Sequence, residues 1–340
     1  NYGKYKYYIL AGDIGGTNCN LGIFGLTKKL PELLVAFNFK SKELKNLYEP
    51  INAVIDYANK QKRVNIKKCC LGIAGALSQK RDYVRLTNAN LHLSIKELLN
   101  KTKLRKIILM NDFEAAGYGI NILSGKGIKT IKKGSKVPKA PIVAVGAGTG
   151  LGKTTMIYDK EKEIYIPLPS EAHHADFPAQ NQIEAELVKF IKKYRKIGNV
   201  SNGDVISGKG IENIYLFLRT TGKYKETIFT KEIDNSKSKH EQISKYRKNE
   251  IICKKAFEVF RDAYARFAKG CALDSLSFNG VYIAGGIAAK NPDIFNKQFI
   301  REFENSHLMK KVLKRIPIYL ITNQNAGLLG AGFAGAKMLK

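Results

Sequence analysis

The chain has 340 residues, 44% of them hydrophobic, which is enough for two globular domains of ordinary size. No apolar run approaches the roughly 20 residues of a membrane-spanning helix, and residues 1–8 lack a signal peptide's apolar core, so we expect a cytoplasmic protein without membrane contact. The net charge of +29 comes from lysines spread along the chain, with no recognisable DNA- or RNA-reading motif. A solvated lysine-rich surface is therefore favoured, with a polyanion-binding patch as the alternative, and nucleic-acid binding is not expected.

The five cysteines are odd in number and widely scattered, and their spacings do not fit a zinc site. A disulfide framework or a metal cluster is therefore not expected. We interpret the cysteines as reduced residues of the core.

The first third of the chain reads as an α/β unit. Residues 6–11 form an apolar run typical of a strand and break at once into a glycine turn at residues 12–17. A helix is predicted at residues 48–59, where apolar residues recur at helical spacing. Further strands are predicted at residues 21–24, 33–39, 69–74 and 106–110.

A second unit begins in the same way. Residues 140–145 run into a glycine turn at residues 146–152, and residues 154–158 and 164–168 follow as a predicted hairpin. The order of strand, glycine turn, strand and strand thus occurs twice, roughly 130 residues apart. We therefore expect a duplicated domain whose two glycine turns face each other across a cleft.

The last third contains the remaining predicted elements. The segment at residues 223–249 is polar and charged without a clear period, and we expect it to be a surface insertion. After it come a helix at residues 251–273, a strand with a third glycine turn at residues 280–287, a strand at residues 317–321 and a small-residue helix at residues 325–335.

The glycine turns at strand ends indicate phosphate binding. In the first turn, glycines at positions 12, 15 and 16 let backbone N–H groups approach phosphate oxygens. Asp13 can hold Mg²⁺ through water, and Thr17 can add a hydroxyl. This turn alone could equally be a tight hairpin with a solvated aspartate. The matching turns at residues 146–152 and 285–286 favour the phosphate site.

The second turn nearly matches a P-loop, because Ala147 to Thr154 fits GxxxxGK[ST] except at the first glycine. A P-loop opens directly into a helix. Residues 154–158 are β-branched and aromatic, which predicts a strand, so the P-loop interpretation is disfavoured.

Two polar segments are candidates for contact with a polyol substrate. Asp112 follows the strand at residues 106–110, where α/β folds keep their ligand crevice, and could accept a hydroxyl proton while Asn111 holds a neighbouring hydroxyl. The alternative is an Asx helix cap. Glu171 and His174 lie in a segment too polar for a core strand and could bind hydroxyls. Neighbouring His173 could be a surface residue, and a zinc pair lacks a third ligand.

Eight segments together resemble, in order and spacing, the bacterial-type glucokinase family over nearly the whole chain. They are residues 12–18, 86–88, 111–113, 141–152, 170–174, 205–208, 283–287 and 327–330. The resemblance implies an α/β fold with two ribonuclease-H-like domains of the actin and hexokinase type, which close on the sugar. It also implies phosphorylation of glucose to glucose 6-phosphate by ATP and Mg²⁺, a place in glycolysis, and a homodimer.

The resemblance also implies roles for single residues. Asp112 corresponds to the base toward the sugar 6-hydroxyl, and the hydroxyl ligands correspond to Asn88, Asn111, Asp112, Glu171 and His174. The nucleotide-binding positions correspond to Gly12, Asp13, Ile14, Gly15, Gly16, Thr17, Gly148, Thr149, Gly285 and Gly286, with Asp13 toward Mg²⁺ through water. Residues 1–111 with about 324–340 are expected to form a small domain, and 112–323 a large one containing the 223–249 insertion. The related repressor-like sugar kinases carry a cysteine-rich zinc motif that this chain lacks.

One departure concerns the sugar. In the family a second glutamate contacts the sugar near its anomeric end, and the matching position here is Gly203, with Asp204 one residue out of register. We therefore expect weaker glucose binding and greater tolerance of changes at C2, unless Asp204 or water substitutes. Two alternatives stay open: a kinase of another hexose, or a weakly active sugar-sensing or polyanion-binding protein on the kinase fold.

Overall fold

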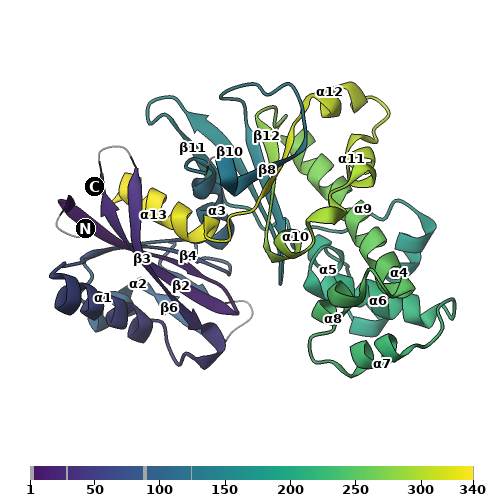
Figure 1. Cartoon of the computed structure of the whole chain (residues 1–340), viewed down its shortest axis with the longest axis horizontal. Helices are drawn as coiled ribbons and strands as arrows, with labels where there is room; N and C mark the ends of the chain where they lie inside the picture. Colours follow the sequence, from purple (N-terminus) through teal and green to yellow (C-terminus); the bar gives the residue numbers. More distant parts are fainter. Residues whose placement is uncertain (1–3, 28–29, 87–89, 124, 340) are drawn as a thin grey trace. The chain divides into compact units, whose positions relative to one another are not determined.

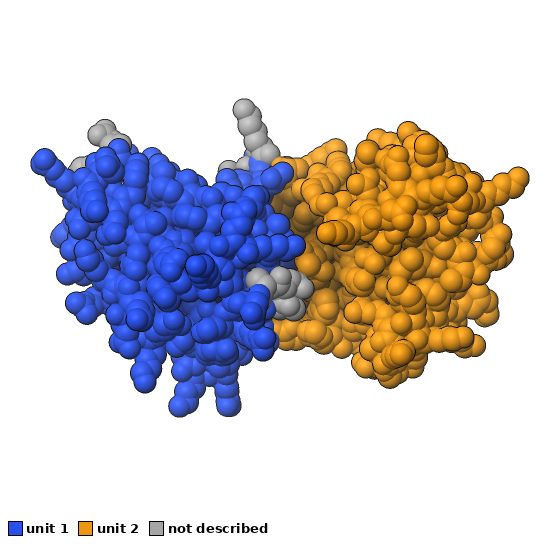
Figure 2. All heavy atoms as spheres, turned by 90° about the horizontal axis from the view of Figure 1, so that it is seen from below, with its two compact units in different colours: residues 1–127, 158–169, 323–340 blue, residues 128–157, 170–322 orange. Residues whose placement is uncertain are grey.

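The computed structural model describes residues 4–27, 30–86, 90–123 and 125–339. The chain divides into two compact units, coloured separately in Figure 2. Unit 1 comprises residues 1–127, 158–169 and 323–340, and unit 2 comprises residues 128–157 and 170–322. Among the described residues, no helix combines the length and the apolar character needed to cross a membrane. All five cysteines lie buried in the cores, as the sequence predicts.

Unit 1 is built on a five-stranded sheet in the order β3-β2-β1-β4-β7, in which β1 pairs antiparallel with β2 and parallel with β4. Its strands are β1 (Tyr7–Ile14), β2 (Asn18–Leu26), β3 (Pro31–Lys40), β4 (Lys68–Ile73) and β7 (Lys106–Asn111). Its other elements are α1 (Tyr48–Lys62), α2 (Ile95–Lys101), α3 (Asp112–Ile120), α13 (Ala326–Met338), the hairpin of β5 (Tyr83–Arg85) and β6 (His92–Ser94), and the short helices η2 (Ser41–Glu43) and η3 (Gly125–Gly127).

Helices cover both faces of this sheet because its strands are apolar on both sides. Side chains alternate along β1, so Leu10 packs into the core that contains α1, while Ile9 and Ala11 pack into the core that contains α3 and α13. Figure 1 shows α1 and α13 on opposite faces of the sheet. This continuous apolar pattern is what predicted buried parallel strands.

Helices α3 and α13 pack closely through glycines. A Cβ at Gly119 would lie 2.4 Å from the Ala326 carbonyl oxygen, and one at Gly330 would lie 1.7 Å from the Ala115 carbonyl oxygen. Only glycine permits this approach of two backbones. The packing places α3 in unit 1, on the other side of the boundary expected at residue 111.

Unit 2 is built on a six-stranded sheet in the order β11-β10-β9-β12-β13-β8. Residues 158–169, which include β11 and the end of β10, are assigned to unit 1. Its strands are β8 (Ile128–Lys132), β9 (Ile142–Ala147), β10 (Leu151–Asp159), β11 (Ile164–Leu168), β12 (Gly280–Ala284) and β13 (Ile318–Ile321). Strand β9 pairs antiparallel with β10 and parallel with β12, as β1 does with β2 and β4. The duplication predicted from the sequence is therefore confirmed.

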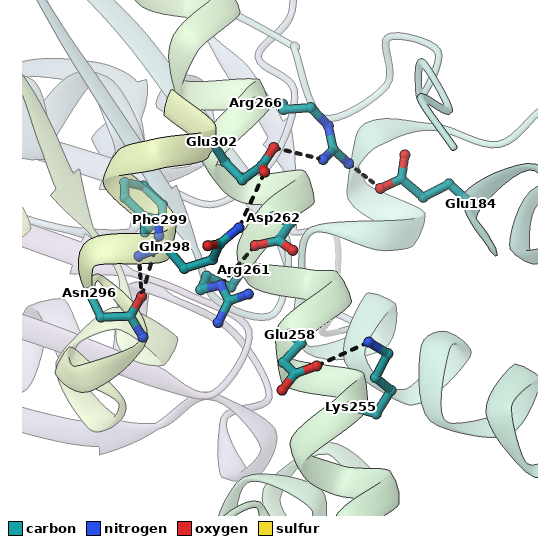
Figure 3. A network of polar contacts seen from close by, with 10 residues as sticks. All are labelled: Glu184, Lys255, Glu258, Arg261, Asp262, Arg266, Asn296, Gln298, Phe299 and Glu302. Carbon is teal, nitrogen blue, oxygen red and sulfur yellow. Dashed lines mark hydrogen bonds and ion pairs between the residues drawn. The ribbon is translucent and has the colours of Figure 1, made fainter. Parts of the chain in front are cut away.

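The helices of unit 2 form one large core with β9, β12 and β13. They are α4 (Gln182–Arg195), α5 (Asn202–Val205), α6 (Gly208–Thr220), α7 (Ile228–Asn235), α8 (Lys239–Tyr246), α9 (Ile251–Asp274), α10 (Gly286–Lys290), η4 (Pro292–Ile294), α11 (Lys297–Glu304) and α12 (Lys310–Arg315). Figure 3 shows how Arg266 of α9 pairs with Glu184 of α4 and with Glu302 of α11, which ties three helices together.

The segment at residues 223–249 is more ordered than a surface insertion. It forms α7 and α8, and Ile233, Ile243 and Tyr246 are buried in the core of unit 2. The sequence conceals these helices because each presents only a few apolar residues among lysines and glutamates.

Candidate functional site

The first glycine turn joins β1 to β2 as a tight hairpin. The Gly15 N–H donates to the Asn18 carbonyl at 2.9 Å, and the Ser41 hydroxyl donates to the Gly15 carbonyl at 2.6 Å. The Ile14 carbonyl accepts from the Ala74 N–H at 2.8 Å, which fastens the turn to the chain after β4. Thr17 is exposed beyond the turn, where its hydroxyl is accessible.

Asp13 and Asp112 lie near the carboxyl ends of β1 and β7, two parallel strands on either side of β4. The strand register aligns Ile14 with Ile73 and Ile73 with Asn111. Burial, together with the negative charge of Asp112, raises the pKa of Asp13 to about 7. Two carboxylates near each other favour a cation between or beside them.

The carboxylate of Asp13 also meets the start of α13. A Cβ at Gly327 would lie 2.5 Å from Oδ2 of Asp13, so any side chain at this position would clash with the carboxylate. Gly327 belongs to one of the segments that carry the family resemblance.

Asn111 serves as the N-cap of α3. Its side-chain oxygen accepts from the Phe113 N–H at 2.8 Å, and Glu114 accepts from the Asn111 N–H at 2.9 Å, which completes a capping box. Arg81 pairs with Glu114 at 2.7 Å. The Asx cap considered as an alternative is therefore present, and it fixes the backbone that carries Asp112.

Asp112 is the first residue of α3, and its Oδ1 accepts from the Phe113 N–H at 2.9 Å. Gly72 on β4 lies beside it, because a Cβ there would be 3.7 Å from the Asp112 Cα. The strand end, the cap and this close approach together position the carboxylate. Asn88, the remaining candidate in this unit, lies outside the described residues.

In unit 2 the second glycine turn is held from two sides. The Gly148 N–H donates to the Gly150 carbonyl at 2.8 Å, and the Gly208 N–H donates to the Gly148 carbonyl at 2.8 Å. Thr149 is exposed at the tip of the turn. The loop therefore has a fixed backbone and an accessible hydroxyl.

The third glycine turn lies beside the second, because β12 pairs parallel with β9 and aligns Ala284 with Gly146. Gly285 has φ +91°, and a Cβ there would lie 2.5 Å from the Ala147 carbonyl oxygen. Gly286 then begins α10. The predicted phosphate residues of unit 2 are thus brought together at one sheet edge, where α/β folds bind ligands.

The P-loop interpretation is excluded by the element that follows the turn. Residues 151–159 form β10, and Lys153 lies within this strand, with its Nζ 3.9 Å from Asp274. A P-loop lysine begins a helix instead.

The polar segment with Glu171 and His174 is pinned against α5. The Asn202 N–H donates to the Ala175 carbonyl at 2.8 Å, and the Gly203 N–H donates to the His173 carbonyl at 3.0 Å. The two predicted hydroxyl ligands face each other, with Nε2 of His174 3.8 Å from Oε2 of Glu171, and both side chains are exposed. Exposed donors and acceptors on a fixed turn are suited to binding a polyol.

His173 is not a surface histidine. It is half-buried, and its Nδ1 accepts from the Leu151 N–H at 3.0 Å. A Cβ at Gly203 would lie 2.1 Å from Cε1 and 2.3 Å from Nε2 of this ring. The ring therefore occupies the space where a side chain at position 203 would begin. The sequence gives no signal for this contact, because 29 residues separate the two positions.

Asp204 does not replace the missing glutamate. Its Oδ2 accepts from the N–H and the hydroxyl of Ser201 at 2.9 and 2.8 Å, and its Oδ1 accepts from Arg195 at 3.0 Å. The carboxylate is thus part of the cap of α5 and of an ion pair.

The residues fit a magnesium ion that the nucleotide helps to hold. Among the residues that the structure describes, no three His, Cys, Asp or Glu side chains gather as a metal site. Mg²⁺ commonly uses one or two carboxylates together with water and substrate phosphates. Asp13, whose pKa is raised beside Asp112, supplies a carboxylate that a nearby cation would stabilise in its charged form.

Known proteins are similar to this chain over nearly its whole length. The glucokinase of Nostoc sp. (strain PCC 7120 / SAG 25.82 / UTEX 2576) is 33% identical over 357 residues, which cover 97% of this chain and 99% of that protein. The crystal structure of glucokinase from Balamuthia mandrillaris in complex with glucose is 20% identical, with a TM-score of 0.78, and the match covers 97% of this chain and 93% of that one.

A more distant structure shares the same fold. The ROK family glucokinase from Streptomyces griseus, solved in complex with glucose and AMPPNP, is 16% identical with a TM-score of 0.64, and the match covers 96% of this chain and 98% of that one. The fold is thus the actin and hexokinase type predicted from the sequence. Residues 10–338 match the family described as Glucokinase. The chain therefore belongs to the Glucokinase family of hexose kinases.

Proposed function

We propose that this chain transfers the γ-phosphoryl group of ATP to the 6-hydroxyl of glucose. The observation that carries the proposal is the position of Asp112, a carboxylate fixed at the carboxyl end of β7 and the first turn of α3. Glucose and a nucleotide analogue are named as ligands of proteins with this fold, which supports the same pair of substrates here.

In the proposed reaction Asp112 accepts the proton of the sugar 6-hydroxyl. The 6-oxygen forms a bond to the γ-phosphorus as the bond from that phosphorus to the bridging oxygen breaks, and ADP leaves with the electron pair. Glu171 and His174 bind sugar hydroxyls and orient the ring, as do Asn88 and Asn111.

The glycine turns hold the phosphates in this proposal. The turns at Gly12 to Thr17 and at Gly148 and Thr149 bind phosphate oxygens through backbone N–H groups other than those of Gly15 and Gly148, which donate within their own turns. Gly285 and Gly286 add the neighbouring turn. Asp13 holds Mg²⁺ through water. When bound, Mg²⁺ neutralises the charge that develops on the phosphate oxygens.

The resemblance further supports a cytoplasmic enzyme of glycolysis that works as a homodimer. Sedimentation of the full chain tests the assembly, since a single species with the mass of one chain would contradict a homodimer.

Replacing Asp112 with asparagine tests the proposed base. Asparagine keeps the oxygen that accepts from Phe113 but cannot accept the proton, so we expect kcat to fall by about 10²- to 10⁴-fold with glucose affinity retained. Coupled ADP release and calorimetric glucose binding measure the two effects. Asp56→Asn, at an exposed position of α1, is the matched control. An unchanged kcat in Asp112→Asn would defeat the assignment.

A further inference from the structure

The sugar segment of unit 2 contains one side chain that the proposed function does not use. The ring of His173 lies between the second glycine turn and Gly203, and a Cβ at Gly150 would approach its Nδ1 to 3.3 Å. Glu171 and His174, the proposed hydroxyl ligands, belong to the same turn as His173. His173 and His174 also contact each other edge to face, with ring centroids 4.6 Å apart.

The hydrogen bond to Leu151 determines which nitrogen of His173 carries a proton. Nδ1 accepts from the Leu151 N–H at 3.0 Å, so the neutral ring carries its proton on Nε2. Burial lowers the pKa of His173, with His174 contributing, so this neutral form is favoured. Within the described part of the chain, Nε2 has no hydrogen-bond acceptor. The ring therefore offers one fixed N–H donor.

The imidazole ring fills the space of the absent side chain. A Cβ at Gly203 would lie 2.1 Å from Cε1, 2.3 Å from Nε2 and 2.4 Å from Nδ1, so the ring stands where the side chain of a glutamate would start. Asp204 is committed to Ser201 and Arg195 and does not enter this space. An imidazole with one N–H donor has therefore taken the space in which the side chain of a glutamate would begin.

We propose that His173 is a specificity-determining residue of the sugar site, whose Nε2–H donates to the oxygen at C1 or C2 of the hexose in place of the family's second glutamate. The proposal rests on the proposed function and deepens it. A carboxylate accepts a hydrogen bond and selects a sugar hydroxyl that can donate, whereas an N–H selects any oxygen with a free lone pair. The chain thus keeps a polar contact at this end of the ring but reverses its direction.

Variants of His173 test the proposal through sugar discrimination. We would measure kcat/KM for glucose, 2-deoxyglucose and 1-deoxyglucose by coupled ADP release, beginning with the unmodified chain. His173→Asn retains an oxygen that can accept from Leu151 but does not reach the Nε2 position, whereas His173→Gln reaches it with an amide N–H. We expect His173→Asn to reduce the preference for glucose over one of the deoxy sugars by roughly 3- to 10-fold, and His173→Gln to preserve it in part.

A purely structural role would give a different pattern, because it would lower kcat/KM for all three sugars by the same factor. Equal preferences in the unmodified chain and His173→Asn would overturn the proposal. An unmodified chain that phosphorylates no hexose would instead contradict the proposed function, and the proposal with it.

Exchange of the two side chains gives an independent test. Gly203→Glu alone forces its side chain into the imidazole, so we expect it to lose more glucose activity than His173→Ala/Gly203→Glu, in which the space is vacated. Glucose binding by calorimetry keeps the test valid when a variant turns over slowly. If Gly203→Glu binds glucose as well as the double variant does, the ring does not hold this space and the proposal is wrong.

Discussion

His173 connects the sugar segment to the strand after the second glycine turn through one hydrogen bond, which its Nδ1 accepts from the Leu151 N–H. Protonation of Nδ1 would abolish the bond from the Leu151 N–H, and burial already lowers the pKa of this ring. The unfolded chain, with a histidine pKa of ordinary value 6.5, therefore takes up the proton more readily than the folded chain does. By linkage, the contribution of His173 to stability is complete above pH 6.5 and declines as the pH falls through that value.

This linkage predicts a pH-dependent stability difference between the unmodified chain and His173→Asn. Urea unfolding would be measured between about pH 5 and 8, where histidine side chains titrate. We expect the free energy of unfolding to fall more steeply with decreasing pH in the unmodified chain than in His173→Asn. If the free energy of unfolding had the same pH dependence in both proteins, the neutral form of His173 would not contribute to stability.

For single residues, the sequence predicts which polar side chains lie at strand ends better than it predicts which residues they contact. Asn111 and Asp112 were predicted at the end of a strand, and they lie there. The sequence also allows Asn111 to be a helix cap, and the structure shows that it is the N-cap of α3. The contact of His173 with Gly203 depends on tertiary packing, which no local pattern records.

Single elements are held by buried polar groups. Lys132 at the end of β8 donates from Nζ to the carbonyls of Leu313, Lys314 and Ile316 at 3.0, 2.8 and 2.7 Å, and pairs with Glu304 at 3.3 Å. These carbonyls belong to the last turn of α12 and the residue after it, beyond which the helix supplies no further N–H donors. The Leu313 carbonyl also accepts from the Ile316 N–H at 3.2 Å. A lysine therefore caps α12 from a neighbouring strand.

Replacing Lys132 with methionine should keep the apolar stem and remove the donors. We expect a loss of about 1 to 3 kcal/mol in the free energy of unfolding, because buried carbonyls and Glu304 are left without their partner. Lys129→Met, at an exposed position of the same strand, is the matched control. Equal stability of the two variants in urea would show that the cap contributes nothing.

Strand β10 leads to a second prediction at the element scale. Because Lys153 extends from a strand toward Asp274, its replacement by alanine should change KM for ATP by less than about 3-fold, as expected for an ion pair with an exposed partner. A loss of ATP binding as large as that caused by altering Gly148 would revive the P-loop interpretation.

Element prediction succeeded where the apolar pattern was continuous and failed where it was sparse. The strands that flank the glycine turns are long apolar runs, and their positions followed from the sequence. Helices α7 and α8 each bury only one or two apolar side chains, so their charged surfaces concealed them.

At the scale of the whole molecule, duplication is the main fact that the sequence revealed. The two sheets repeat an antiparallel hairpin beside parallel strands, and a glycine turn joins the two strands of each hairpin. The division of the chain was harder to predict, because α3 groups with unit 1 through contacts with α13, more than 200 residues later.

We propose that ATP phosphorylates the 6-hydroxyl of glucose on this chain. The most direct measurement compares ADP release in the presence of ATP and Mg²⁺ with glucose and with 6-deoxyglucose, which lacks only the reacting hydroxyl. We expect one ADP for each glucose 6-phosphate formed and no sugar-dependent ADP with 6-deoxyglucose. Equal ADP release with both sugars, or none with glucose, would contradict it.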